Sequence, residues 1–321
     1  MPVQEVREAT KATVIPLRPA PSDLPARPAR GLASVTELRP HRAPESLADR
    51  LTGFVRDRLT GDYPVDDFGF DQQLTDTVVL PPLRLVYEKW FRVEVTGEKN
   101  LPVDGGALIV ANHSGTLPWD AVMTSVAVHD NHPRGKHLRM LGADLVFRLP
   151  VLGTLARRTG QTVACDADAQ RLLKAGELVG VWPEGFKGVG KPFSERYRLQ
   201  RFGRGGFVAT AARAGVPIIP CSIVGAEEIH PKIADIKPLA KLLGLPYFPV
   251  TPFFPLLGPL GAIPLPTKWR IDFGAPIRTD LASPDAADDN AFVLDVAAEV
   301  RETIQRTLDG MVAERESVFR G

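Results

Sequence analysis

Apolar residues in this chain recur at two periods, one typical of strands and one typical of helices. Between residues 92 and 224, short apolar runs alternate with segments in which apolar positions are three or four residues apart. The runs predict strands at 92–96, 108–111, 137–141, 162–165, 178–182 and 216–224. The intervening segments predict helices at 118–128, 145–156, 167–175 and 205–214. This alternation predicts an α/β fold with a largely parallel central sheet flanked by helices.

Two further regions precede this alternation, and a longer domain contains it. Residues 1–44 are rich in proline, arginine and alanine, and we expect a disordered tail because they bury little apolar surface. Residues 45–84 form an N-terminal amphipathic helical region, with a helix from Ser46 to about Leu59. A second amphipathic stretch covers 83–91. Residues 85–321 form the main domain, which ends in a helix over 289–316.

The segment 238–266 is apolar but contains a proline every few residues. Proline at this density excludes a continuous helix or a central strand. We therefore predict an extended apolar flap that covers the core, lines a tunnel for a lipid chain or rests in a membrane interface. Its large apolar residues are Leu245, Tyr247, Phe248, Phe253, Phe254, Leu256 and Leu257.

Composition and charge exclude several classes of protein. The formal net charge of +1 gives no field that would favour nucleic acid as a partner. Two cysteines, Cys165 and Cys221, are too few for a disulfide scaffold or a cysteine zinc site, and they fit a reducing compartment. The sequence shows neither a secretory signal nor a run of about 20 apolar residues free of proline and charge. We expect a cytoplasmic protein that lies on the inner face of a membrane without crossing it.

Two motifs carry the candidate chemistry, and the first follows the strand at 107–111. It reads Asn-His-Ser-Gly-Thr-Leu-Pro-Trp-Asp, from Asn112 to Asp120. A histidine with a carboxylate on its second nitrogen suits proton removal from an alcohol near neutral pH. On one helix His113 and Asp120 would be about 10 Å apart, but a turn at Gly115 and a helix starting at Pro118 bring them together. Alternatively, His113 only bonds a loop and Asp120 only complements the helix dipole.

The second motif, Trp-Pro-Glu-Gly-Phe-Lys at 182–187, closes the strand at 178–182. The residues from Gly185 to Lys191 also approach the phosphate-binding pattern G-x-x-x-x-G-K-[ST] of nucleotide-binding proteins. Pro192 in the last position lacks the hydroxyl that holds magnesium, which argues against that alternative. Basic residues nearby indicate an anion site or a solvated basic face, and they are Lys187, Lys191, Arg196, Arg198, Arg201 and Arg204.

Taken together, these motifs resemble the glycerolipid acyltransferase superfamily, which includes the lysophosphatidic acid acyltransferases. The first family block corresponds to Asn112, His113 and Asp120, and the third to residues 182–187. The fourth block, an apolar strand entered by proline, corresponds to 216–220. The resemblance covers about residues 85–275 and makes 85–321 the acyltransferase domain.

The chain departs from the family pattern in three ways. Six residues separate His113 from Asp120 where four are usual, so the chain resembles the longer-loop branch akin to monoacylglycerol-type acyltransferases. The hydroxyl–arginine pair of the third block is replaced by Phe186 and Lys187. The arginine of the second block is missing after Gly160. A phosphorylated acceptor is therefore not implied.

The resemblance implies an O-acyltransferase of lipid metabolism and phospholipid biosynthesis. Its acceptor is a glycerol-based lipid: a lysophospholipid, monoacylglycerol or diacylglycerol. The donor is an acyl-CoA or acyl carrier protein thioester, a cosubstrate, and we expect no other cofactor and no metal. His113 is the general base and Asp120 orients it. The expected substrate-binding residues are Asn112, Ser114, Glu184, Gly185, Lys187 and Arg204. The alternatives are a lipid-binding protein without turnover and the nucleotide-binding protein; the oligomeric state stays open.

Overall fold

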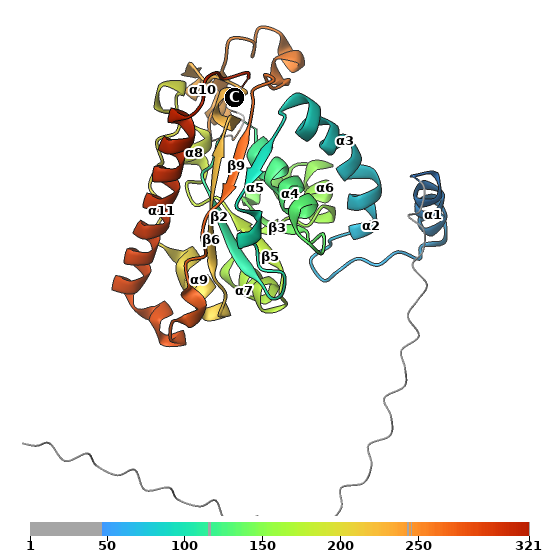
Figure 1. The fold of residues 1–321 in the computed structure, drawn as a ribbon. Helices are drawn as coiled ribbons and strands as arrows, with labels where there is room; N and C mark the ends of the chain where they lie inside the picture. Colours follow the sequence, from blue (N-terminus) through green and yellow to red (C-terminus); the bar gives the residue numbers. More distant parts are fainter. Residues whose placement is uncertain (1–46, 115–116, 243, 245, 321) are drawn as a thin grey trace, which may run out of the picture. The chain divides into compact units, whose positions relative to one another are not determined.

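A seven-stranded sheet forms the centre of the protein in the computed structural model, which describes residues 47–114, 117–242, 244 and 246–320 (Figure 1). Its strand order is β1-β9-β6-β2-β5-β3-β4, and a separate pair of short strands, β7 and β8, lies outside it. The strands are β1 Glu94–Thr96, β2 Ala107–Ala111, β3 Leu138–Gly142, β4 Thr162–Val163, β5 Leu178–Val181, β6 Ile218–Val224, β7 Ala234–Asp235, β8 Pro249–Val250 and β9 Arg270–Phe273.

The sheet is mostly parallel, as the alternation of strands and helices predicted. Its one antiparallel pairing is β6 with β9, and β1 pairs parallel to β9 at the edge. At the centre, β2 pairs parallel to both β5 and β6, with Ala107 opposite Leu178 and Leu108 opposite Ile218. The carboxyl ends of β2 and β5 are therefore neighbours. The two motifs follow these strands and therefore meet beyond their carboxyl ends.

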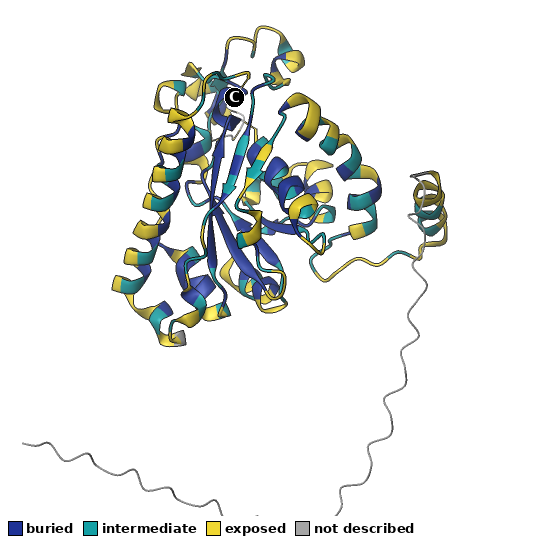
Figure 2. Ribbon diagram, in the orientation of Figure 1, coloured by how far each residue is buried: buried dark blue, intermediate teal, exposed yellow. Residues whose placement is uncertain are grey.

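Alternate residues of the central strands pack into two cores, one on each face of the sheet. Figure 2 shows the central strands mostly in the colour of buried residues. In β2, Ala107 and Ile109 face a core shared with the helices α3 (Leu80–Leu85) and α4 (Trp119–Asn131). Leu108 and Val110 face a core shared with α7 (Asp166–Lys174), α9 (Gly206–Ala214) and α11 (Asn290–Ala313). Residues on both faces of a strand are apolar because helices cover both sides of a parallel sheet. This explains the continuous apolar run at 107–111.

The helices agree broadly with the predicted segments. The α-helices are α1 Leu47–Thr60, α2 Gln72–Leu74, α3 Leu80–Leu85, α4 Trp119–Asn131, α5 Asp144–Arg148, α6 Leu152–Arg158, α7 Asp166–Lys174, α8 Phe186–Val189, α9 Gly206–Ala214, α10 Lys237–Leu242 and α11 Asn290–Ala313. Two π-helical turns are η1 Thr75–Val79 and η2 Val86–Trp90. The 3₁₀ turns are η3 Glu98–Asn100, η4 Phe193–Glu195, η5 Ala226–Glu228, η6 Gly258–Ala262, η7 Thr279–Leu281 and η8 Pro284–Asp288.

The helix expected at 83–91 begins earlier than predicted. It runs without interruption from α2 through η1 and α3 to η2. It starts at Gln72 because Asp71 caps the first turn by accepting a hydrogen bond from the Leu74 amide. Arg58 and Arg158 both bond the buried Asp71 carboxylate, at 2.7 and 3.1 Å. These charge-assisted contacts tie the start of the helix to its surroundings.

The single helix predicted over 145–156 is wrong, because the chain forms two short helices there. Pro150 lacks an amide hydrogen and its ring collides with the preceding turn, so α5 ends at Arg148 and α6 starts at Leu152. Val151, between them, has φ of +65°, an unusual backbone conformation for a β-branched residue. Its side chain is 79% exposed.

The flap at 238–266 is less extended than predicted. It contains most of α10, the strand β8 paired with β7, and the 3₁₀ turn η6. Leu245 lies outside the described residues, as does the predicted tail at 1–44. Several apolar side chains of the segment face solvent, among them Leu256, Leu257 and Leu260. Within the described ranges, no helix has the length and apolar character needed to cross a membrane.

Candidate active site

His113 and Asp120 form a hydrogen-bonded pair at the carboxyl end of β2. The Nδ1 atom of His113 is 2.7 Å from Oδ2 of Asp120, and the same oxygen accepts a hydrogen bond from the Ser114 amide at 2.9 Å. Asp120 lies in the first turn of α4 and is fully buried. Pro118 was expected at the first helical position but precedes it, and Trp119 starts the helix. The expected contact across the loop is therefore present.

The pairing fixes which nitrogen of His113 is available for chemistry. A carboxylate oxygen only accepts hydrogen bonds, so Nδ1 carries the hydrogen and Nε2 holds the lone pair of the neutral ring. The side chain of His113 is 16% exposed and lines the main cavity of the described structure. The ring can thus take up a proton from a molecule bound there, while Asp120 stabilises the resulting positive charge.

Asn112 anchors the loop that carries His113. Its side-chain Oδ1 accepts a hydrogen bond from the Ile223 amide at 2.8 Å, and its Nδ2 donates to the Ile223 carbonyl at 3.0 Å. This pair of bonds joins the end of β2 to β6, and the Asn112 side chain is fully buried. Asn112, which was expected to bind substrate, therefore has its polar atoms committed to the fold.

Glu184 supports the same loop from the second motif. Its Oε1 accepts a hydrogen bond from the His113 amide at 2.8 Å, and its Oε2 accepts one from the Gln200 amide at 2.6 Å. The carboxylate is buried, and Nζ of Lys191 lies 3.7 Å from it. Both oxygens are held by main-chain donors, so these contacts favour a positioning role for Glu184 over contact with a headgroup.

Lys191 was grouped with the anion-binding residues, and this interpretation is wrong. The Lys191 ammonium is buried, lies 3.0 Å from the Glu227 carboxylate and donates to the Arg198 carbonyl. Burial raises the pKa of Glu227 to about 7, although the neighbouring Lys191 charge acts in the opposite direction. Lys191 therefore stabilises a buried charge cluster behind Glu184 and is not available to a phosphate.

Two glycines shape the loop between these groups. Gly185 has φ of +54°, in the region that favours glycine, and α8 follows it directly. A Cβ atom added to Gly188 would lie 2.7 Å from Cβ of Glu184 and 3.0 Å from Cβ of His113. Sequence reasoning missed Gly188. The signal available was the Gly185–Gly188–Gly190 spacing, which had been interpreted only as an approach to a phosphate-binding loop.

The remaining predicted site residues are more dispersed. Ser114 is buried, and its Oγ has no hydrogen-bond partner within the described part of the chain. Lys187 in α8 and Arg204 before α9 are exposed. Neither is among the described residues that line the main cavity.

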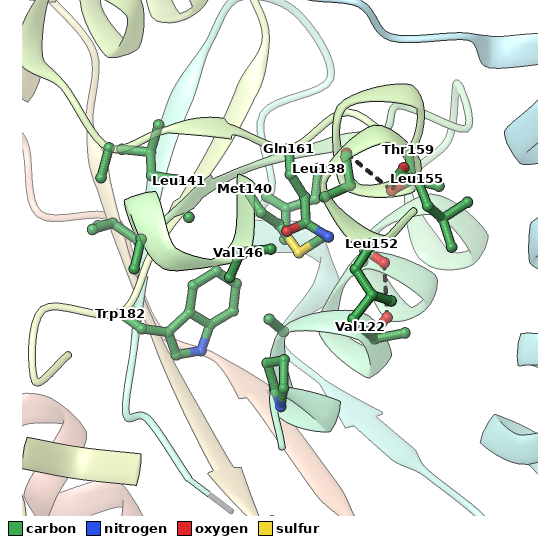
Figure 3. Close-up of a pocket in the computed structure, with 18 of the residues that line it drawn as sticks. Val122, Leu138, Met140, Leu141, Val146, Leu152, Leu155, Thr159, Gln161 and Trp182 are labelled. Carbon is green, nitrogen blue, oxygen red and sulfur yellow. Dashed lines mark hydrogen bonds between the residues drawn. The ribbon is translucent and has the colours of Figure 1, made fainter. Parts of the chain in front are cut away.

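The main cavity has a volume of about 590 Å³, and His113 is one of its lining residues. Figure 3 shows part of its wall. This size is within the range of about 300–1,000 Å³ typical of small-molecule sites. Its wall is mostly apolar and comes from α3, α4, β3, α5 and α6 together with Trp182. The residues labelled in the close-up are Val122, Leu138, Met140, Leu141, Val146, Leu152, Leu155, Thr159, Gln161 and Trp182.

Trp182 lines this wall, and its buried Nε1 has no hydrogen-bond partner among the residues that the structure describes. The indole ring lies 6.1 Å from the His113 ring, measured between centroids. A buried N–H without a partner is costly, so this donor is suited to a bound molecule that supplies an acceptor.

A second cavity of about 330 Å³ lies under the flap. It shares Phe186 and Tyr247 with the main cavity and is otherwise lined mainly by residues 246–262. Burial raises the pKa of Tyr247 to about 12, which keeps its hydroxyl neutral at ordinary pH. The two cavities thus meet at an aromatic boundary beside the second motif.

The wall of the main cavity reaches the surface at the turn between α5 and α6. Leu149, Leu152 and Leu155 line the cavity and are also exposed. With the exposed Val151, they make an apolar rim, which we call the α5–α6 rim. An exposed apolar rim at a cavity is typical of a site that admits an apolar ligand.

The chain is similar to acyltransferases in three comparisons. Residues 92–224 match the family described as Acyltransferase. An uncharacterized protein of Mycobacterium tuberculosis is 56% identical over 92% of this chain and 82% of its own length. A human "DGAT1/2-independent enzyme synthesizing storage lipids" is 25% identical over 68% of this chain and 62% of its own. The crystal structure of a 1-acyl-sn-glycerophosphate acyltransferase, PlsC, from Thermotoga maritima has a TM-score of 0.50 and 18% identity, over 83% of this chain and 90% of that one.

Proposed function

The chain belongs to the glycerolipid acyltransferase superfamily, and we propose that it transfers a fatty acyl group from a thioester to a hydroxyl of a glycerolipid. The donor is an acyl-CoA or acyl carrier protein thioester, and the acceptor is a lysophospholipid, monoacylglycerol or diacylglycerol. The observation that carries this proposal is the His113–Asp120 pair at the wall of an apolar cavity. Relatives named for storage-lipid synthesis and for acylation of 1-acyl-sn-glycerol-3-phosphate support this acceptor class.

The proposed reaction uses His113 as general base. Nε2 removes the proton of the acceptor hydroxyl as its oxygen attacks the thioester carbonyl carbon, and Asp120 stabilises the imidazolium through Nδ1. The tetrahedral intermediate then collapses, the carbon–sulfur bond breaks, and the imidazolium returns its proton to the departing thiolate. No acyl-enzyme is required, since Cys221 is buried in the core and Cys165 is exposed outside both motifs.

The loop contacts keep this base in place. Glu184 bonds the His113 amide and Asn112 bonds β6, so the loop is held from two sides by buried groups. A base held in advance lowers the entropic cost of reaching the reactive geometry. We assign Glu184 and Asn112 as positioning residues in the proposed reaction.

Trp182 is proposed to contact the substrate directly. Trp182 lines the cavity beside His113, its Nε1 has no hydrogen-bond partner among the described residues, and a thioester or ester carbonyl is an acceptor that a lipid substrate brings. Such a donor is most useful if it bonds the carbonyl oxygen more strongly as negative charge develops on it. The ring would at the same time pack against the acyl chain.

We further propose that lipid enters across the α5–α6 rim while the protein lies on a membrane surface. The rim exposes Val151 and Leu152, and the flap exposes Leu256. Each exposed leucine or valine that enters the interface adds on the order of 1 kcal/mol to membrane affinity. The inner face of a cytoplasmic membrane is the expected location, and Lys187 is the candidate for contact with a charged headgroup.

The two alternatives differ in what supports them. A non-catalytic lipid-binding protein would use the same cavity without needing the His113–Asp120 pair. The nucleotide-binding alternative loses its basis, because Lys191 is paired with Glu227 in the interior and Pro192 offers no amide hydrogen.

The decisive experiment is acyl transfer by the purified full chain. Labelled acyl-CoA or acyl carrier protein is incubated with lysophospholipids, monoacylglycerol or diacylglycerol in vesicles, and the labelled product is identified. We expect one acceptor class to be acylated and His113→Ala to reduce turnover by at least about 10²-fold with unchanged lipid binding. Lipid binding without product from any donor would establish the scaffold alternative. Comparing Lys187→Ala with Arg204→Ala on a phosphorylated acceptor tests which charge contacts the headgroup.

A further inference from the structure

A second polar cluster lies where η1, the end of α4 and the start of β3 meet. Asp76 comes from the π-helical turn η1, His129 from the last turn of α4, and His137 from the residue before β3. Their sequence separations, 53 and 8 residues, give no motif. The fold alone brings them together. Single π turns occur frequently at functional sites.

The three side chains converge on one point. Nε2 of His137 lies 3.1 Å and Nε2 of His129 lies 3.7 Å from Oδ1 of Asp76. One potential ligand atom from each residue lies within 4.8 Å of the others. Tetrahedral zinc with bonds of about 2.0–2.1 Å spaces its ligand atoms by about 3.3 Å, between the two measured distances.

Two of these atoms lack the hydrogen bonds expected of buried polar groups. Oδ1 of Asp76 and Nε2 of His137 are both buried without a hydrogen-bond partner in the described structure, although they are only 3.1 Å apart. Ligand atoms that three separate segments bring within 4.8 Å of one another have the spacing of ligands around one ion. Left unoccupied, each orphaned group would cost about 1–3 kcal/mol.

The surroundings of His129 also match those of a metal ligand. Its second ring nitrogen, Nδ1, is 2.9 Å from the Asp130 carboxylate, which leaves Nε2 free to coordinate. A carboxylate on the distal nitrogen is the usual outer partner of a zinc-bound histidine, since it fixes the tautomer and raises the basicity of the ligand. Arg84 Nη2, which can only donate, is 3.3 Å from the same Nδ1, but Arg84 already donates to both oxygens of Asp130 at 2.8 and 2.5 Å. The shorter contact of Nδ1 with Asp130, at 2.9 Å, favours the tautomer with the hydrogen on Nδ1.

We infer that Asp76, His129 and His137 bind a divalent first-row transition metal ion, zinc being the ion that fits best. Two imidazoles and one carboxylate favour zinc over magnesium or calcium, which prefer oxygen ligands. The ion would join η1, α4 and the start of β3. Because Thr75 and His137 also line the main cavity, it would stabilise the far wall of that cavity from behind.

The test is direct zinc binding by the purified full chain after removal of metal with a chelator. Calorimetric titration with zinc chloride should give saturable binding of one ion per chain. X-ray absorption should show nitrogen and oxygen ligands at about 2.0–2.1 Å with the signature of two imidazoles. Magnesium and calcium chloride should give no saturable binding. Zinc should also raise the melting temperature of the chain, since a ligand that binds only the folded state stabilises it.

Variants separate this site from the proposed active site. Asp76→Asn and His129→Gln should each weaken zinc binding by more than tenfold, and Asp130→Asn by about tenfold. His113→Ala should retain zinc binding and still lose acyl transfer. Absence of saturable binding by the unmodified chain would overturn the inference. So would binding that Asp76→Asn and His129→Gln, both shown to be folded by circular dichroism, leave unchanged.

Discussion

A single methyl group added at Gly188 should disable the His113–Asp120 pair without removing any of its polar atoms. The Cβ of an alanine there would lie 2.7 Å from Cβ of Glu184 and 3.0 Å from both Cβ and the carbonyl oxygen of His113. Ordinary contacts of a Cβ atom begin at 3.4 Å. The loop carrying His113, the turn carrying Glu184, or both must therefore move.

The size of the effect follows from these distances. The shortfall is roughly half an ångström, and a displacement of about 1 Å at a reacting group costs about 10²-fold in rate. We therefore expect Gly188→Ala to reduce kcat by about 10- to 100-fold. The KM for the thioester should change little, because the cavity wall beyond His113 is untouched.

The assay is steady-state acyl transfer to the acceptor identified above, with thermal unfolding measured in parallel. Gly310→Ala is the matched control, because Gly310 lies exposed in α11 and an added Cβ would meet nothing within 4 Å. This control should keep full activity and gain up to about 1 kcal/mol of stability. A folded Gly188→Ala protein with normal kcat would refute the idea that close packing behind His113 sets the position of the base.

Four further substitutions test other parts of the site. Asp120→Asn should lower kcat by about 10²- to 10⁴-fold with little effect on KM, because the amide no longer enforces the required tautomer of the base; equal kcat would contradict its role. Trp182→Phe should lower kcat/KM by about tenfold or more while thermal stability holds or rises, since the orphaned N–H is removed; a loss of stability alone would argue for a packing role. Val151→Asn should weaken vesicle binding in flotation assays, because it replaces an exposed apolar side chain of the α5–α6 rim with a polar one; unchanged binding would argue against membrane contact by this rim. Between pH 4.5 and about 7 the unfolded chain releases the Glu227 proton while the folded chain retains it, so this group makes stability fall as pH rises. Glu227→Gln should remove that decline, on the order of 1–3 kcal/mol, when denaturant unfolding is compared across the window.

Much of the fold could be predicted because strands and helices have different apolar periods. The run at 107–111 and the helical spacing of α11 each record a burial pattern that local sequence carries directly. The split at Pro150 was predictable in principle from the missing amide hydrogen. The early start of the helix at Gln72 was not, because the capping carboxylate of Asp71 is held by Arg58 and Arg158, which are far apart in sequence.

The candidate site divides in the same way. The contact between His113 and Asp120 could be anticipated because a short loop and a helix start constrain it locally. The partners of Glu184 could not, since the His113 and Gln200 amides reach it only after β2 and β5 pair. The Lys191–Glu227 pair and the Asp76 cluster likewise depend on distant segments. The residue types indicate which side chains could bind a ligand. Which partner each buried side chain has depends on the segments that the fold brings next to it.

The long-range bonds around the loop after β2 have a consequence for synthesis of the chain. His113 and Asp120 leave the ribosome early, but the carboxylate that holds the His113 amide comes at residue 184 and the strand that anchors Asn112 at residue 223. The edge strand β1 waits still longer, because it pairs only with β9 at residues 270–273. A nascent chain therefore exposes its apolar central strands until most of the polypeptide has been made, which favours slow folding and engagement by chaperones.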